Sequence, residues 1–235
     1  MFAKIRFYYG AATISFIAAG IMVPLMMIFK NKRSKILHQY NAVILKFLGG
    51  KIETTGKRDN SVDMFAMNHQ GIIDIIAMEA AEPSDIRWVA KKQLFDAPWF
   101  GFLLKLPNMV CVDRENKAGL IKLIKDAKAT KEDEHHRILA IFPEGTRTDK
   151  QTLLPFKGGT RIIAEKLKLR IQPIIITNSK LLLNEHTKTA HSATVHITYL
   201  EPFTVDKSDK EWYQNLQKMM QDRIDQEKIE HERER

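Results

Sequence analysis

The sequence contains a single cysteine among its 235 residues, Cys111. No disulfide bond can therefore form within the chain, and this composition fits a reducing compartment. The chain also lacks internal repeats and low-complexity linkers, so we expect one folded domain with an appendage. Its hydrophobic content of 44% excludes a wholly disordered protein.

Acidic residues are absent from the first 35 positions, which hold six Lys and Arg residues. The net charge of the whole chain is +9, so the remaining residues contribute only +3. A nucleic-acid-binding domain would carry the positive excess itself, and we therefore expect no nucleic-acid partner. The basic residues instead flank one apolar segment, a pattern that indicates contact with a membrane surface.

The apolar segment runs from Phe7 to Phe29 and contains no charged residue. A helix of this length would extend about 35 Å, enough for a hydrocarbon core of roughly 30 Å. A signal peptide is less consistent with so long a run followed by a basic cluster. That cluster predicts a catalytic domain on the cytoplasmic face of a membrane, which we expect to be a bacterial inner membrane. Pro24 leaves a kinked or re-entrant arrangement open beside full spanning.

Strand-like and helix-like segments alternate after an amphipathic helix at 36–48, which stops at two glycines. The pattern predicts an α/β fold with a mixed, largely parallel sheet flanked by helices. We expect membrane-associating helices, single or paired, in residues 1–50 and the α/β domain in 51–235. The predicted strands are 62–67, 86–90, 109–112, 138–142, 171–177 and 194–200. The predicted helices are 72–80, 96–105, 117–130 and 159–169, followed by a last helix that begins with a capping box at Ser208–Glu211.

The segment Asn68-His69-Gln70-Gly71-Ile72-Ile73-Asp74 places an acid five positions after a histidine, where a predicted strand passes into a helix. Functional sites of α/β sheets form at such carboxyl ends of strands. A carboxylate on one ring nitrogen of His69 would leave the other nitrogen free to accept a proton. Asp74 could instead serve only the helix N-terminus, and the motif alone leaves both interpretations open.

Two further segments end predicted strands with arginine. The stretch Ile141 to Thr148 reads IFPEGTRT, and its turn displays Arg147, whose forked guanidinium suits a phosphate. The stretch Val110 to Gly119 contains Asp113 and Arg114, which alone would be an ordinary surface ion pair. The carboxyl ends of neighbouring strands would bring these residues to a common edge with His69.

These blocks in this order resemble the glycerolipid acyltransferase family, and within it the 1-acylglycerol-3-phosphate acyltransferases. The matching segments are His69–Asp74, Val112–Arg114, Phe142–Thr148 and Pro173–Ile176. The resemblance implies transfer of an acyl chain from a thioester to the sn-2 hydroxyl of 1-acylglycerol-3-phosphate, giving phosphatidic acid. It implies His69 as general base oriented by Asp74, which would make acyl transfer direct.

The resemblance also implies how the substrates are held. Arg114 and Arg147 would bind the acceptor's phosphate, with Glu144, Gly145 and Thr146 shaping the substrate site. The partners would be membrane lipid, lysophosphatidic acid, and either acyl-coenzyme A or acyl-acyl carrier protein as co-substrate, with no cofactor. The apolar stretch 94–106 could line an acyl-chain channel or could simply pack in the core.

Several alternatives remain. The acceptor could be glycerol-3-phosphate or another lysolipid, and an acceptor without phosphate would make both arginines dispensable. A protein of another class, a membrane-tethered protein that binds anionic lipid, would consume no thioester. The sequence has no GxSxG elbow for a serine nucleophile. A metal at His69 and Asp74 would need further ligands that the sequence does not offer, so we expect no metal.

Overall fold

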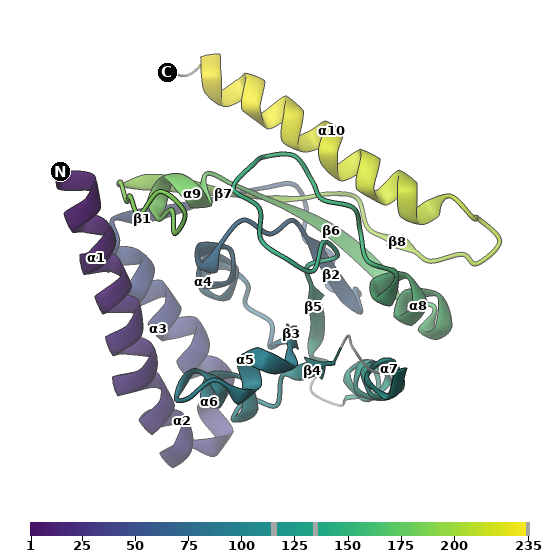
Figure 1. Ribbon diagram of the computed structural model, residues 1–235. Coiled ribbons are helices and arrows are strands. Elements are labelled where there is room, and N and C mark those ends of the chain that lie inside the picture. The colour runs from purple at the N-terminus through teal and green to yellow at the C-terminus, as the bar shows by residue number, and fades with distance from the viewer. Residues whose placement is uncertain (114–116, 134–135, 234–235) are drawn as a thin grey trace.

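The structure, a computed structural model, describes residues 1–113, 117–133 and 136–233 (Figure 1). Arg114, one of the predicted phosphate ligands, lies outside the described residues. Within them, an eight-stranded sheet has the order β1-β7-β6-β2-β5-β3-β4, with β8 beside β6. The strands are β1 (Gly50–Thr55), β2 (Met64–Met67), β3 (Ile86–Lys91), β4 (Val110–Val112), β5 (Ile138–Ile141), β6 (Arg170–Thr177), β7 (Ala193–Tyr199) and β8 (Phe203–Thr204).

Most neighbouring strands are parallel, as predicted. Strand β6 pairs in parallel with β2, but antiparallel with both β7 and β8. Strands β2, β5 and β3 lie next to one another and are parallel, so their carboxyl ends point to the same edge of the sheet. The predicted class of a mixed, largely parallel sheet flanked by helices is confirmed.

Helices cover both faces of the sheet (Figure 1). The helical elements are α1 (Phe2–Ser15), the π-helical segment η1 (Phe16–Met22), α2 (Val23–Ile28), the 3-10 turn η2 (Lys30–Lys32), α3 (Arg33–Phe47), α4 (Ile72–Ala81), α5 (Lys92–Asp96), α6 (Phe100–Lys105), α7 (Lys117–Lys131), α8 (Gly158–Leu167), α9 (Ser179–Leu182) and α10 (Trp212–Arg233). Strand β2 shows how the two faces are separated. Its Phe65 and Met67 face one core with α3 and α4, whereas Met64 and Ala66 face the other with α7, α8 and α10.

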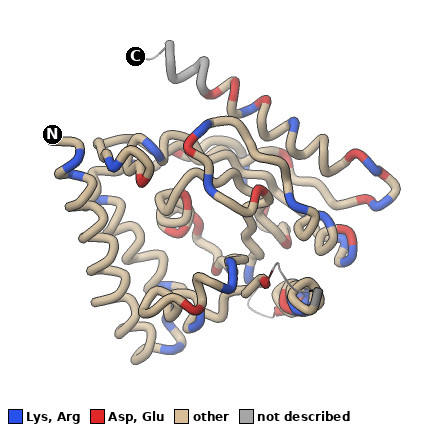
Figure 2. The backbone as a smooth tube through the Cα atoms, in the orientation of Figure 1, with Lys and Arg blue, Asp and Glu red and all other residues tan. Residues whose placement is uncertain are grey.

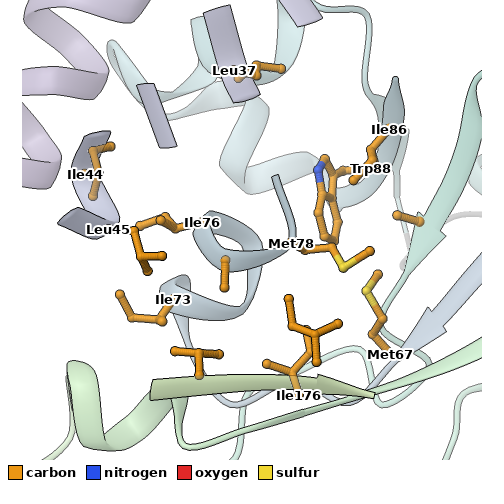
Figure 3. Close-up of a cluster of buried hydrophobic side chains, with 14 of the residues drawn as sticks. Leu37, Ile44, Leu45, Met67, Ile73, Ile76, Met78, Ile86, Trp88 and Ile176 are labelled. Carbon is orange, nitrogen blue, oxygen red and sulfur yellow. The ribbon is translucent and has the colours of Figure 1, made fainter. Parts of the chain in front are cut away.

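Helix α3 packs along α4 and closes the first core. One buried cluster contains side chains from both helices, Leu37, Ile44 and Leu45 of α3 and Ile73 and Ile76 of α4 (Figure 3). All five side chains are at most 6% exposed. Burial of each such side chain contributes about 1.5–3 kcal/mol, so the N-terminal helices are held on the α/β core by ordinary apolar packing.

The N-terminal apolar segment forms one continuous helical unit over Phe2–Ile28, long and apolar enough to cross a membrane. Only 22% of its most apolar window is buried inside the structure. Pro24 lacks an N–H, and the turn that precedes it is the π-helical η1 rather than regular α-helix. The tube in Figure 2 shows that charged residues gather at the ends of these helices and leave their middle uncharged.

Two predictions about local structure are wrong, and one strand at the edge of the sheet was missed. Strand β1 was not predicted, because its residues after Lys51 are mostly polar and exposed at the edge of the sheet. The predicted helix 96–105 begins only at Phe100, as α6, since Pro98 and the positive φ of Trp99 (60°) separate it from α5, which ends at Asp96. The last helix begins only at Trp212, and the hydroxyl of Ser208 donates to Asp206 instead of capping it.

The boundary predicted at residue 50 coincides with the start of β1. The helices before it nevertheless share a core with the sheet and α4. The division of the chain into residues 1–50 and 51–235 stays a prediction.

Candidate active site

The candidate site lies at the carboxyl ends of β2, β5 and β6. His69 follows β2, and Gly145 and Arg147 follow β5. The side chain of Asn68 fixes this edge, because its amide donates to the carbonyl of Ile176 at 2.8 Å and accepts from the Ile176 N–H at 2.7 Å. Asn68 thus takes part in the ladder between β2 and β6 and sets where the chain turns toward His69.

His69 and Asp74 form a direct pair. Nδ1 of His69 lies 2.8 Å from Oδ2 of Asp74, which also accepts the N–H groups of Gln70 and Gly71 at 2.6 and 2.8 Å. Asp74 is fully buried, in the first turn of α4. Because an ionised carboxylate only accepts hydrogen bonds, Nδ1 carries the hydrogen and Nε2 keeps its lone pair. The arrangement can therefore remove a proton from a group bound beside Nε2. Asp74 caps the helix and orients the histidine with the same oxygen.

The imidazole of His69 is held on its face by Phe142, at the end of β5. The two rings are stacked with centroids 3.8 Å apart and an angle of 11° between them. Trp88 of β3 stacks on Phe142 in turn, at 5.4 Å. These stacked rings and the Asp74 hydrogen bond leave the imidazole little freedom to rotate, so it is preorganised.

Glu144 holds the backbone of His69 in place. Its carboxylate accepts the N–H of His69 at 2.9 Å and the N–H of Leu154 at 2.8 Å. Burial raises the pKa of Glu144, although the two backbone hydrogen bonds oppose that rise. The side chain is fully buried and is separate from the residues that line the cavity beside His69.

Gly145, Thr146 and Arg147 present the other side of the site. Gly145 has a positive φ of 67°, which favours glycine and turns the chain after β5. Thr146 and Arg147 are exposed and line the same cavity as His69. The structure therefore brings His69, Asp74 and Arg147 together, as the sequence predicted.

An apolar cavity of about 710 Å³ extends from His69 between the sheet and the N-terminal helices. This volume is within the range of small-molecule sites, about 300–1,000 Å³. Part of the stretch 94–106 lines it. The lining includes Leu94, Phe100, Leu103 and Leu104 from α5 and α6, Ile14, Ala18 and Met22 from the N-terminal unit, and Leu37 and Ile44 from α3. Trp99 and Phe102 are exposed and do not belong to the lining.

Two charged residues beside Arg147 were not predicted from the sequence. Nζ of Lys180 lies 2.6 Å from Oε2 of Glu185, and Nη1 of Arg147 lies 3.5 Å from Oε1. Neither Lys180 nor Glu185 belongs to a motif. The available signal was position, since Lys180 lies in the first turn after the strand at 171–177, where a site of an α/β sheet is expected.

A second buried acid, Glu79, was also missed. Its Oε1 accepts the indole N–H of Trp88 at 2.6 Å, and its Oε2 lies 3.2 Å from Nδ1 of His38. Burial raises the pKa of Glu79 to about 7. Glu79 lines the apolar cavity from the same helix as Asp74. Its position in the helical period would only have indicated a buried face.

Other chemistry has little support. Burial raises the pKa of the Cys111 thiol, which disfavours the nucleophilic thiolate. Among the described residues, no group of three or more His, Cys, Asp or Glu side chains could hold a metal ion.

A buried histidine–aspartate pair at the wall of an apolar cavity, at the edge of an α/β sheet, is an arrangement that group-transfer enzymes with lipid-like substrates can use. The chain belongs to the Acyltransferase family, whose model matches residues 52–177. A Helicobacter pylori protein named 1-acyl-sn-glycerol-3-phosphate acyltransferase is 37% identical over 218 residues, which cover 92% of this chain and 91% of that protein. A Bacillus subtilis protein of the same name is 36% identical over 135 residues, 56% of this chain and 64% of its own.

A solved structure shares the fold. The 1-acyl-sn-glycerophosphate acyltransferase PlsC of Thermotoga maritima superposes with a TM-score of 0.75 at 19% identity, covering 97% of this chain and 95% of that one. The superposition includes the N-terminal helices, because so little of either chain is left out.

Proposed function

We propose that the protein transfers an acyl chain from an acyl thioester to the sn-2 hydroxyl of 1-acylglycerol-3-phosphate and forms phosphatidic acid for phospholipid synthesis. The observation that carries this proposal is the His69–Asp74 pair at the wall of a large apolar cavity that Arg147 also lines. The names of the relatives in Helicobacter pylori and Bacillus subtilis support the same substrate.

His69 acts as the general base in this reaction. Nε2 takes the proton of the acceptor hydroxyl while that oxygen attacks the thioester carbonyl; the carbon–sulfur bond then breaks, and the leaving thiolate takes the proton from the imidazolium. Asp74 keeps Nδ1 protonated and stabilises the imidazolium that forms. Glu144 acts through His69, because its carboxylate holds the His69 N–H. It is a positioning residue.

Arg147 binds the phosphate of the acceptor. A guanidinium can donate two parallel hydrogen bonds to phosphate oxygens, and Arg147 is 46% exposed, so a substrate can reach it. Gly145 and Thr146 shape the wall between Arg147 and His69. Arg114 is the second predicted phosphate ligand.

The apolar cavity receives an acyl chain. Its walls are supplied mainly by aliphatic and aromatic side chains, which favour hydrocarbon over water. The chain enters as a thioester of coenzyme A or of acyl carrier protein. Transfer needs no further cofactor, since the base and both substrates account for every bond made and broken.

The protein works at a membrane. Its N-terminal unit exposes large apolar side chains, among them Phe2, Ile5, Tyr8, Tyr9, Phe16, Ile28 and Phe29. Lys30, Lys32 and Lys35 follow it and favour anionic lipid headgroups. We place the catalytic domain on the cytoplasmic face of a bacterial inner membrane, where lysophosphatidic acid would reach the cavity from the lipid phase.

The test is release of thiol from acyl-coenzyme A and from acyl-acyl carrier protein by the detergent-solubilised full chain, with and without lysophosphatidic acid. Mass spectrometry identifies the lipid product. We expect phosphatidic acid only with the acceptor present, and a loss of about 10²- to 10⁴-fold in His69→Ala. The melting temperature of His69→Ala serves as the folding control.

Other acceptors decide between the remaining interpretations. Glycerol-3-phosphate and lysophosphatidylcholine are assayed beside lysophosphatidic acid, and a faster reaction with either would replace the proposed acceptor. Full activity of His69→Ala would contradict the assigned base. No thiol release with any acceptor, together with binding of anionic vesicles, would favour a tethered lipid-binding protein.

A further inference from the structure

Lys180 lies beside the active site, although it is far from His69 and Asp74 in the sequence. It belongs to α9, which begins two residues after β6 ends. Its ammonium group is drawn inward, and its side chain is 15% exposed, against 46% for Arg147. A lysine that serves only solubility keeps its ammonium group in water, so the burial of this one indicates a specific partner.

That partner is the carboxylate of Glu185, which has the surroundings expected of a bound anion. Its Oε2 pairs with Lys180 at 2.6 Å, and its Oε1 accepts the N–H of Ile72 at 3.0 Å and lies 3.5 Å from Arg147. Burial alone raises the pKa of a carboxyl group, but the hydrogen bonds from Lys180 and Ile72 hold the pKa of Glu185 below its usual value. The surroundings therefore stabilise a negative charge.

The position of this carboxylate matches the needs of the acceptor. Ile72 and Arg147 line the cavity together with His69, and Ile72 is the first residue of α4, whose N–H has no partner within the helix. Only a few covalent bonds separate the sn-2 oxygen of the acceptor from its phosphorus. Arg147 lines the same cavity as His69, so a phosphate bound by Arg147 would lie next to the groups that hold Glu185.

Gly71 leaves room for the side chains of Lys180 and Glu185. A Cβ atom at Gly71 would lie 2.8 Å from Oε2 of Glu185 and 3.2 Å from Nζ of Lys180. The φ of Gly71 is −166°, an extended value open to any residue. Glycine at this position therefore leaves room for charged groups at the start of α4.

We propose that Lys180 and Arg147 together bind the phosphate of the acceptor, and that the Glu185 carboxylate occupies their position until the acceptor displaces it. This inference rests on the proposed function, because it assigns a further residue to the same acceptor. Glu185 must move aside because a phosphate and a carboxylate on the same two cations repel each other. A phosphate dianion displaces it because it carries more charge and more acceptor oxygens.

The first test compares Lys180→Gln with Lys188→Gln, an exposed lysine of the same connection to β7. The Michaelis constants of lysophosphatidic acid and of the thioester are measured for each. Lys180→Gln should raise the acceptor constant about tenfold or more and leave the thioester constant unchanged. Lys180→Arg should retain most acceptor affinity, and Lys188→Gln should behave like the wild type. Equal changes in both constants, or an unchanged acceptor constant, would overturn the assignment.

The second test uses inorganic phosphate as the probe and Glu185→Gln as the variant. The Glu185→Gln variant lacks the carboxylate charge that would compete with phosphate. Phosphate should therefore inhibit it more strongly, in competition with lysophosphatidic acid, and should raise its melting temperature more than that of the wild type. Lys180→Gln should remove this thermal protection. Weaker phosphate binding in Glu185→Gln would mean that Glu185 has only a structural role in its loop. That result would overturn the proposal that phosphate displaces Glu185.

The two proposals fail in different ways. A wild type that acylates lysophosphatidic acid, with a Lys180→Gln variant of unaltered acceptor constant, contradicts this inference and leaves the proposed function intact. A wild type without acceptor-dependent thiol release contradicts the proposed function. The thermal protection by phosphate then still decides whether Lys180 forms an anion site.

Discussion

Helix α4 carries two buried carboxylates, and they have opposite surroundings. Asp74 lies in the first turn, where the N–H groups of Gln70 and Gly71 and the ring of His69 converge on one oxygen. Glu79 lies near the other end, where it meets the Trp88 indole and His38 inside the apolar core. Each leaves one oxygen without a hydrogen bond among the described residues.

The difference shows how position on a helix decides what an acid can do. The N-terminal end of a helix offers free N–H groups and a positive partial charge, which stabilise an anion. The C-terminal end has the opposite polarity, and burial there raises the pKa of Glu79 to about 7. The N-terminal end of α4 therefore favours a carboxylate anion beside His69, while its C-terminal end favours the protonated form of Glu79.

The sharpest test of this comparison is Asp74→Asn beside Glu79→Gln. Asp74→Asn removes the charge that stabilises the His69 imidazolium, and we expect kcat to fall by about 100-fold or more. Glu79→Gln can still accept the Trp88 hydrogen bond and should leave kcat nearly unchanged. Steady-state rates at saturating substrates measure both. Similar losses in the two variants would mean that the ends of α4 do not differ in function.

Arg147→Ala extends the test to the groups that face the N-terminal end of α4. Loss of a charged hydrogen bond to the phosphate should raise the acceptor Michaelis constant about 10- to 100-fold. The thioester constant should change far less, because the acyl chain contacts the apolar part of the cavity. An equal rise in both constants would indicate a structural role for Arg147.

The pH dependence of stability tests the C-terminal end. A carboxyl group whose pKa is raised from 4.5 to about 7 in the folded state binds its proton more tightly there. The contribution of Glu79 to the free energy of unfolding is therefore complete below pH 4.5 and is lost as the pH rises toward 7. The loss amounts to about 3 kcal/mol or less, and the nearby His38 reduces it.

The Glu79→Gln variant lacks this ionisable group. Its free energy of unfolding should therefore change less with pH than that of the wild type between pH 4.5 and 7. Denaturant unfolding at several pH values gives the curves. Glu132→Gln is the matched control, because the Glu132 side chain is 63% exposed and should not contribute. A wild-type curve that is already flat would contradict the assignment to Glu79.

Trimming the cavity wall should have the smallest effect. Leu104→Ala enlarges the cavity and should shift chain-length preference toward longer thioesters, with little change in the rate for the best substrate. Phe102→Ala, on the same helix but outside the lining, is the control. Competition between thioesters of different length measures the preference. The same shift in both variants would point to general loosening of α6.

The sequence by itself determined the class of fold and that His69 and Asp74 could form a pair. Alternating strand and helix patterns require a largely parallel sheet, and the carboxyl ends of parallel strands gather at one edge. His69 and Asp74 are local neighbours across a strand–helix turn, so their spacing alone allows the contact that the structure contains. The apolar N-terminal helix is equally local, because length and composition define it.

Only the tertiary structure decided which distant residues lie beside His69 and Asp74. Lys180 and Glu185 reach the start of α4 because β6 lies beside β2, and no periodicity encodes that adjacency. Glu79 and His38 meet because α3 packs on α4. Phe142 stacks on His69 because β5 pairs with β2 in one register. Local patterns fix which elements form, whereas contacts between elements depend on how the whole chain buries its apolar surface.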